Sequence, residues 1–253
     1  MIESFGVSKV GLVRTVNEDF IFSEDRPFFI LADGMGGYEG GQLASRLAVV
    51  TAAEYLKKFS ASAYSEDVIR TAVLFANRAL LRAKISDPSL DGMGTTLVVA
   101  AFFQDKMFFA NVGDSRIYRE TGGVMTQLTR DHSFVMELFE AGKISKEEMR
   151  NHPKRNEVTR AVGLQSALAV DTGFVSFTGP TKILLCSDGI SVPLGDAFIQ
   201  KVLAETGNRG DELGKAVELL TNGVYEKGAG DNLSAILVSY LPDDGEIVNG
   251  EER

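Results

Sequence analysis

The sequence has 253 residues, of which 44% are hydrophobic and 24% charged, and its formal net charge is −9. A chain of this length and composition can bury a large core, as one large domain or two small ones. The excess of acidic residues argues against a nucleic-acid partner, because phosphate backbones require a basic face, and it suits an enzyme that recruits cations.

The sequence favours a cytoplasmic location and a monomer. Its first residues, MIESFGVSKVGLVR, lack the basic start and apolar core of a secretory signal. The longest apolar run is far shorter than the ~20 residues that a membrane span requires. The single cysteine, Cys186, excludes an internal disulfide and fits a reducing compartment, where we expect it to be a small core residue.

Short apolar runs rich in β-branched and aromatic residues predict buried strands. They are FFILA (28–32), TTLVVAAFF (95–103), KMFFANV (106–112), RIYRE (116–120), KILLC (182–186) and LSAILVSY (233–240). The tripeptides QDK (104–106) and TGG (121–123) are typical of hairpin turns, so residues 95–128 are predicted to form an antiparallel meander.

Two helices are predicted between the first strands and the meander. The first covers Gln42–Lys58 and places Leu43, Leu47 and Val50 at helical spacing. The second starts after Ser65, where acidic residues suit the positive end of the helix dipole. Its apolar face consists of Ile69, Val73, Ala76 and Leu80.

A second pair of helices is predicted at 196–205 and 211–226, before the final strand at 233–240. Strands and paired helices in separate blocks indicate an α+β fold rather than strict βαβ alternation. The polar segment 130–163 is too long for a simple connection and is predicted to be a functional flap. We expect one domain, 1–241, followed by an acidic, disordered tail, 242–253.

Four aspartates stand at the ends of apolar runs: Asp33, Asp114, Asp188 and Asp231. A carboxylate beside a buried strand is costly unless it is paired or bound to a metal, although a single Asp-Gly is more often a turn. The nearest basic residues are Arg14 and Arg116. Oxygen ligands without Cys or His suit Mg²⁺ or Mn²⁺ better than zinc, so a site for such ions is predicted if the four converge.

Other phosphate chemistries fail on spacing. The residues after Gly36 lack the lysine of a phosphate-binding loop, and Glu39 stands where a dinucleotide fingerprint requires its third glycine. A cysteine phosphatase needs an arginine six residues after its nucleophile, but Val192 occupies that position after Cys186. With only two histidines, a Ser-His-Asp mechanism has little support.

Eight motifs together resemble the metal-dependent protein phosphatases of the PP2C (PPM) type, in their compact bacterial branch. In chain order they are GLVRTVNED (11–19), ADGMGG (32–37), MGTT (93–96), VGDSR (112–116), LTRDHS (128–133), HPKRNEVTRAVG (152–163), LLCSDG (184–189) and GDN (230–232). The resemblance implies a four-layer α-β-β-α sandwich, with two antiparallel sheets flanked by helix pairs. It also implies hydrolysis of phosphoserine and phosphothreonine in proteins by water activated between bound Mn²⁺ or Mg²⁺ ions.

The resemblance implies metal ligands at five matching positions. Asp33 would bridge two ions, and the Gly34 carbonyl would bind the second of them. Asp188 and Asp231 would complete the ligands of the first ion. Asp114, with Asp188, would hold a third and weaker ion.

It also implies supporting roles for four residues near these ligands. Arg14 would grip the substrate phosphate, with a guanidinium fork that matches two phosphate oxygens. Glu18 and Asp19 would support the second ion, partly through water. Asn232 would orient its neighbouring ligand.

The chain departs from many eukaryotic members of the family at Met35. Those members carry a histidine there, which is proposed to protonate the leaving oxygen, whereas methionine has no proton to donate. His132 and His152, both in the predicted substrate flap, are candidates for this role by elimination, and packing within the flap is the simpler role for each.

Two other functions stay open at this point: a non-catalytic relative that binds metal or phosphoproteins, and a small-molecule phosphatase or nucleotide-binding enzyme. The intact aspartates argue against the first, and the failed phosphate-loop spacings argue against the second. The expected partners are phosphorylated proteins, either a Ser/Thr kinase and its substrates or a protein of the anti-sigma-antagonist type.

Overall fold

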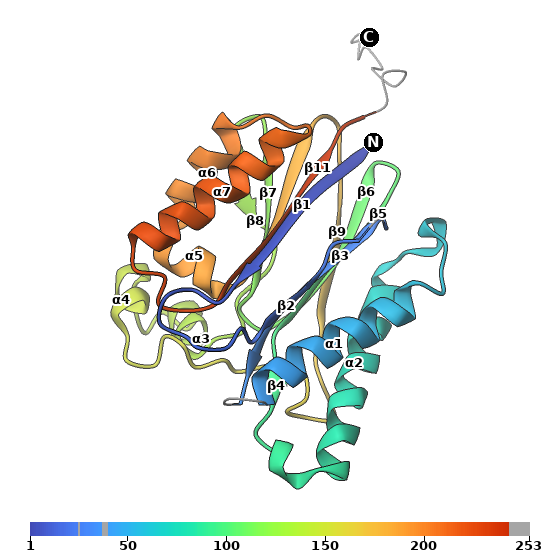
Figure 1. Cartoon of the computed structure of the whole chain (residues 1–253), viewed down its shortest axis with the longest axis vertical. Coiled ribbons are helices and arrows are strands. Elements are labelled where there is room, and N and C mark those ends of the chain that lie inside the picture. Colours follow the sequence, from blue (N-terminus) through green and yellow to red (C-terminus); the bar gives the residue numbers. More distant parts are fainter. Residues whose placement is uncertain (25, 37–39, 243–253) are drawn as a thin grey trace.

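The computed structural model describes residues 1–24, 26–36 and 40–242 of the chain. Its strands form two antiparallel sheets that face each other (Figure 1). The five-stranded sheet has the order β1 (Ile2–Lys9), β11 (Leu233–Tyr240), β10 (Thr181–Cys186), β7 (Arg116–Thr121) and β8 (Val124–Gln127). The second sheet has the order β2 (Asp19–Phe22), β3 (Phe28–Met35), β5 (Leu97–Phe103), β6 (Lys106–Val112) and β9 (Asp171–Ser176), with the short β4 (Gly94–Thr95) paired to β3.

Helices cover the outer face of each sheet, as Figure 1 shows. The second sheet is covered by α1 (Gly40–Leu56) and α2 (Glu66–Ser86). The five-stranded sheet is covered by α5 (Asp188–Leu194), α6 (Asp196–Glu205) and α7 (Asp211–Glu226). Three hydrophobic clusters fill the spaces between successive layers. The predicted four-layer sandwich is therefore confirmed.

Strand β3 shows why the apolar runs are continuous rather than alternating. Phe28, Ile30 and Ala32 pack toward the helices α1 and α2, whereas Phe29 and Leu31 pack between the two sheets. Successive side chains of a strand point to opposite faces, and here both faces are buried, so every position must be apolar. The run ends where the chain reaches Asp33.

The predicted meander over 95–128 is wrong in its topology. Its two hairpins, β5–β6 and β7–β8, form as expected, but they belong to different sheets. The chain crosses between the sheets at residues 113–115, where Gly113 has a φ of 106°. A side chain at Gly113 would also meet Thr96 at 2.6 Å, so this crossing depends on glycine.

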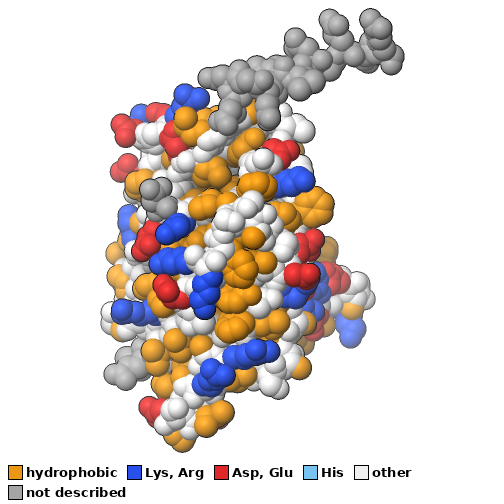
Figure 2. Space-filling model, turned by 90° about the vertical axis from the view of Figure 1, so that its right-hand side faces the viewer, with side chains coloured by type: hydrophobic (Ala, Val, Ile, Leu, Met, Phe, Trp, Pro, Cys, Tyr) orange, Lys and Arg blue, Asp and Glu red, His pale blue; other side chains and the backbone are white. Residues whose placement is uncertain are grey.

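The first predicted helix forms, but of the three apolar residues noted at helical spacing Leu47 alone packs against the core. The face buried against the sheet is made of small residues, among them Ala44, Ala48 and Ala52, which let the helix approach the strands closely. Leu43 and Val50 lie on the opposite side and are 40% and 45% exposed. Figure 2 shows hydrophobic side chains among basic ones on the side of the molecule that includes α1 and α2.

The other helices agree closely with their predictions. The Ser65 side chain accepts a hydrogen bond from the Val68 N–H and so caps α2, and the four predicted apolar residues of α2 are buried. Helices α6 and α7 and strand β11 have the predicted bounds. Strands β1, β2 and β9 and helix α5 were not predicted. No helix of the described residues is long and apolar enough to cross a membrane.

The flap segment 130–163 is more regular than its polar sequence suggests. It contains α3 (Phe134–Glu140) and α4 (Lys146–Asn151), each capped by a serine side chain. Isolated bridges join Ser133 to Val158 within the segment and Thr95 to Val162 at its end.

Short 3-10 helices occur outside the flap, at Ala61–Ala63 and Pro88–Leu90. Apart from residue 242, the predicted acidic tail lies outside the described residues.

Candidate metal centre

Asp33 lies at the end of β3 and is fixed there by its main chain. Its N–H donates to Thr96 Oγ1 at 2.9 Å, and its carbonyl accepts from Thr96 N and Thr95 Oγ1, both at 2.8 Å. Asp19 on β2 is its direct partner in the antiparallel register. The pairing places two carboxylates side by side at one end of the second sheet.

The other three predicted aspartates reach the same place from the opposite sheet or from the crossing between sheets. Asp188 follows β10 as the first residue of α5, and Asp231 precedes β11. Asp114 lies in the crossing after β6. The Asp33 carboxyl lies close enough to Asp188, Asp114 and Asp231 for the charge of each to raise its pKa. The four aspartates therefore converge, as the sequence predicted, and Asp19 lies among them.

Crowding of these acids changes their titration. Burial, and then the charges of Asp19, Asp188, Asp114 and Asp231, raise the pKa of Asp33 well above its usual value. Burial raises the pKa of Asp19 to about 7 and, together with the charge of Asp188, that of Asp114 to about 8. Like charges held together in a dry place favour the protonated form, so the centre has a strong demand for positive charge.

Glu18 and Asp19 present buried oxygen atoms without hydrogen-bond partners toward this centre. Asp19 Oδ2 accepts a hydrogen bond from Ser187 Oγ at 2.9 Å, but Asp19 Oδ1 and Glu18 Oε1 have no partner. Buried polar atoms are nearly always satisfied, so the unpartnered oxygens of Glu18 and Asp19, beside the clustered aspartates, fit a role in binding a cation. No group of three or more acidic, His or Cys side chains of the described residues has the geometry of a complete metal site.

Two predicted residues hold the loop 10–18 against the centre. Asn232 Nδ2 donates to the carbonyls of Val10 and Val16, its Oδ1 accepts from Glu18 N at 2.8 Å, and its own N–H donates to Asp231 Oδ1. These contacts connect Asn232 to Asp231, and the orienting role of Asn232 stays a prediction. Arg14 on the same loop forms a two-point ion pair with Asp231, at 2.9 and 3.0 Å, and its side chain is half exposed.

Gly34 and Met35 follow Asp33 along β3. A Cβ at Gly34 would lie 2.0 Å from the Gly41 carbonyl oxygen and 2.7 Å from that of Glu18, so only glycine fits. Met35 pairs with Gly94 of β4 in the strand register. Position 35 therefore lies next to the centre, and its side chain brings no proton to it.

The two histidines pack the flap. His132 is 1% exposed; its Nδ1 accepts from Gly113 N at 3.1 Å, and its Nε2 lies 3.0 Å from Asp171 Oδ2. Burial lowers its pKa. His152 ends α4, and its ring lies against Phe134. Both positions agree with the simpler prediction, packing, rather than with contact to a substrate.

Sequence reasoning missed the buried ion pair between Arg116 and Asp131. Arg116 Nε lies 3.0 Å from both Asp131 oxygens and Nη2 lies 2.6 Å from one of them, while Nη1 donates to Tyr118. Asp131 binds Arg116 and His132 binds Gly113, so these two neighbours in sequence hold the chain before and after Asp114. The motif RDHS could have indicated this ion pair, since its acid stands next to a histidine in a polar segment and has no other obvious partner.

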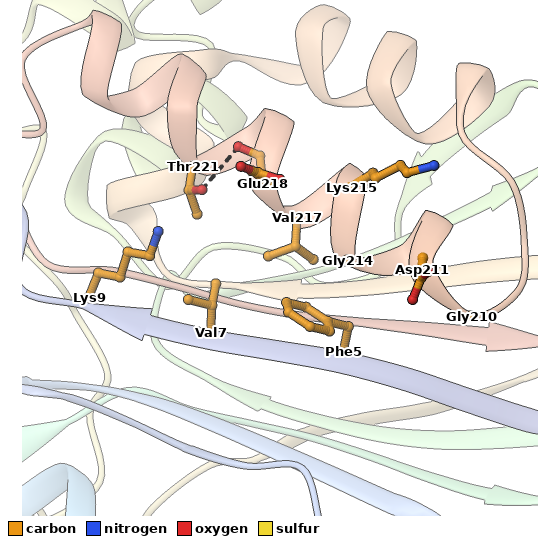
Figure 3. A pocket seen from close by; sticks show the side chains of 10 residues that line it. All are labelled: Phe5, Val7, Lys9, Gly210, Asp211, Gly214, Lys215, Val217, Glu218 and Thr221. Atoms are coloured by element: carbon orange, nitrogen blue, oxygen red, sulfur yellow. Dashed lines mark hydrogen bonds between the residues drawn. The ribbon is translucent and has the colours of Figure 1, made fainter.

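A separate hollow of about 490 Å³ lies between β1 and α7 (Figure 3). Figure 3 shows Phe5 and Val7 pointing from the strand toward the helix, where Gly214 has no side chain to fill the space. None of the clustered carboxylates lines this hollow. It is a packing gap on the outer face of the five-stranded sheet, remote from the acidic centre.

The fold and the acidic centre define a class of protein: an α-β-β-α sandwich with a carboxylate cluster between its sheets. The sequence pattern of the protein phosphatase 2C family matches residues 13–221. The serine/threonine phosphatase Stp of Listeria innocua is 36% identical over 235 residues, which cover 90% of this chain and 92% of that protein.

The crystal structure of the serine/threonine phosphatase PstP of Mycobacterium tuberculosis superposes with a TM-score of 0.87 at 30% identity, covering 96% of this chain and 99% of that one. A structure of the PstP catalytic domain in complex with two manganese ions gives 0.83, also at 30% identity, and covers the same shares. The chain belongs to the protein phosphatase 2C family. It is a protein serine/threonine phosphatase of the bacterial type.

Proposed function

We propose that this phosphatase works with two divalent cations, Mn²⁺ or Mg²⁺, held by its acidic centre. The supporting observation is the pair of unpartnered buried oxygens, on Glu18 and Asp19, beside converging aspartates whose pKa values are raised by burial and by the charges of their neighbours. The donor set is entirely oxygen, which hard cations prefer. The manganese complex of the similar PstP domain supports the same choice.

Within this proposal Asp33 would be a ligand of both ions, and the Gly34 carbonyl a ligand of the second. Asp188 and Asp231 would complete the ligands of the first ion, and Asp114 with Asp188 would hold a third, weaker one. When bound, such a pair of ions supplies charge neutralisation and lowers the pKa of a water that attacks phosphorus. Phosphoryl transfer needs positioning and charge stabilisation more than a protein nucleophile, and among the described residues the lone thiol, on Cys186, is buried.

The protein's own residues position the substrate and its surroundings. Arg14 exchanges its two-point contact with Asp231 for one with two phosphate oxygens, which have the same planar, bidentate geometry. Glu18 and Asp19 support the second ion, and Asn232 keeps the loop that carries Arg14 in register with Asp231. The leaving oxygen takes its proton from a group other than Met35.

The substrate class is phosphoserine and phosphothreonine in proteins, and the physiological setting is bacterial signalling that opposes a Ser/Thr kinase or acts on an anti-sigma antagonist. We further propose that residues 1–241 form one catalytic domain that acts as a monomer in the cytoplasm. In support of a single domain, the cluster between the sheets contains residues from the beginning of the chain, such as Ile2, and from its end, such as Tyr240.

The test uses a phosphothreonine peptide and measures phosphate release with Mn²⁺ and with excess chelator. Asp33→Asn and Asp188→Asn should each lower turnover by at least about 100-fold, since ligand networks of this kind are sensitive to single changes. The matched control is Asp91→Asn, at an exposed aspartate. Calorimetric titration with Mn²⁺ gives a readout independent of activity. Full turnover in excess chelator would refute the proposal.

A further inference from the structure

A cleft of about 390 Å³ opens beside the acidic centre, between the flap and the turn from α5 to α6. Its inner end reaches Asp114 and Asp188. Its walls carry apolar side chains from both sides, with Phe139 on the flap 39% exposed and Val192 on α5 59% exposed. This volume is within the ~300–1,000 Å³ range of small-ligand sites, and the walls offer apolar surface that a bound chain would cover.

The flap wall of the cleft is basic. Lys146, Arg150 and Arg155 line it, all on the flap. Within the described part of the chain, neither arginine has an acidic partner at ion-pair distance, and Lys146 is shared only with Asp196 at 3.7 Å. The charges of the two arginines are therefore available to an anionic group of a bound ligand.

The cleft thus combines an acidic end with basic side chains on its flap wall, and each suits a different part of one ligand. The acidic end adjoins the centre where the scissile phosphate would be processed. A chain that leaves this centre along the cleft would meet both the apolar walls and the unpaired arginines, because all of them line the same cleft. Charge complementarity at the flap wall then favours a negative group over a neutral or positive one.

We propose that this cleft binds the substrate segment next to the phosphorylated residue, and that it selects an apolar side chain together with an acidic group. The acidic group is a carboxylate or a second phosphate, which share the chemistry that Arg150 and Arg155 recognise. This inference rests on the proposed function, because it assigns the flanking sequence that the same centre accepts. Phe139 contacts the apolar side chain, and the arginines contact the acid.

The experiment uses phosphothreonine peptides with an alanine background, in which each flanking position is replaced in turn by Leu, Glu, phosphoserine or Lys. For the wild-type protein with Mn²⁺, the best Glu position should raise kcat/KM by about 5-fold over alanine, the value expected for one or two partly exposed ion pairs. Phosphoserine should exceed Glu at that position because it carries about two charges. Lys there should lower kcat/KM.

Three variants assign the effect to the cleft. Arg150→Ala with Arg155→Ala should abolish the preference for acid, and Phe139→Ala should abolish the preference for Leu. The control is Lys143→Ala, an exposed flap lysine outside the cleft. Hydrolysis of p-nitrophenyl phosphate, which has no flanking segment to contact Phe139 or the two arginines, should stay within about twofold of wild type in each of these variants, because the centre itself is unchanged.

Reversing the charge provides a result that damage to the fold cannot imitate. The double variant Arg150→Glu, Arg155→Glu should prefer Lys over Glu at the same position. A wild-type protein that hydrolyses all the peptides equally, or an acidic preference that survives loss of both arginines, would overturn the cleft inference alone. If the wild type hydrolyses no phosphothreonine peptide with Mn²⁺ present, the proposed function fails, and this inference fails with it.

Discussion

Replacing Asp19 with asparagine should stabilise the metal-free protein and weaken its response to Mn²⁺. The asparagine side chain keeps the shape and an acceptor for Ser187, while its amide brings a donor to neighbouring carboxylates in place of a charge. Burial moves the pKa of Asp19 from 3.8 to about 7. This is about three units, or about 4 kcal/mol when the carboxylate is ionised, and we expect a gain of about 2 to 4 kcal/mol once neighbouring acids readjust.

The sign of the pH dependence follows from the raised pKa. Below pH 3.8 Asp19 is protonated in both the folded and the unfolded chain, so the variant should gain nothing there. Between 3.8 and about 7 the folded state binds the extra proton, so the stability of the wild type falls as the pH rises through this window. The advantage of the variant should therefore grow across the same range and be complete by pH 8.

The assay is urea unfolding in the presence of chelator, at pH 8 and at the lowest pH at which the protein stays soluble. The same measurement is then made with Mn²⁺. A ligand present at 100 times its Kd raises the free energy of unfolding by about 2.7 kcal/mol, and this increment should be smaller in the variant. Asp91→Asn, at an exposed aspartate, serves as the control and should change neither quantity. Equal stability of variant and wild type in chelator at pH 8 would refute the electrostatic reasoning.

Three further changes test the scaffold of the site. Gly34→Ala forces a Cβ against the Gly41 carbonyl and should cost at least about 3 kcal/mol in urea unfolding. Ser65→Ala removes the cap of α2 and should cost about 1 kcal/mol by the same assay, with normal turnover. Arg116→Lys loses the forked contact with Asp131 and should lower the free energy of unfolding by about 1 to 3 kcal/mol. The variant should also need a higher Mn²⁺ concentration for half-maximal activity. An unchanged Mn²⁺ dependence would contradict a role of Arg116 in positioning Asp114.

The sequence predicted best those elements whose pattern depends only on neighbours along the chain. Helix α2 was predicted with its cap and buried face because the spacing of Ile69, Val73 and Leu80 and the serine before them are local signals. The buried side of helix α1 was not predicted, because it consists mostly of small residues, and hydrophobicity alone points to Leu43 and Val50 on the opposite side. The small residues make sense only once the close approach to β3 is known.

Longer-range features were harder to predict. Hairpin turns specify that two strands pair, but they do not specify that β5–β6 and β7–β8 belong to different sheets. The converging aspartates were predicted because each stands at the end of an apolar run, a pattern visible in the sequence. The ion pair between Arg116 and Asp131 was not predicted, and neither were the threonines that hold Asp33. In both cases the two partners lie at least fifteen residues apart in the chain.

The acidic centre contains residues from both sheets. Asp19 and Asp33 belong to one sheet, and Asp188 and Asp231 adjoin strands of the other. The apolar cluster between the sheets, which includes Phe29 and Leu185, determines how the two sheets are placed relative to each other. If the centre holds cations as proposed, conservative changes in this core should therefore alter metal affinity, although they touch none of the carboxylates.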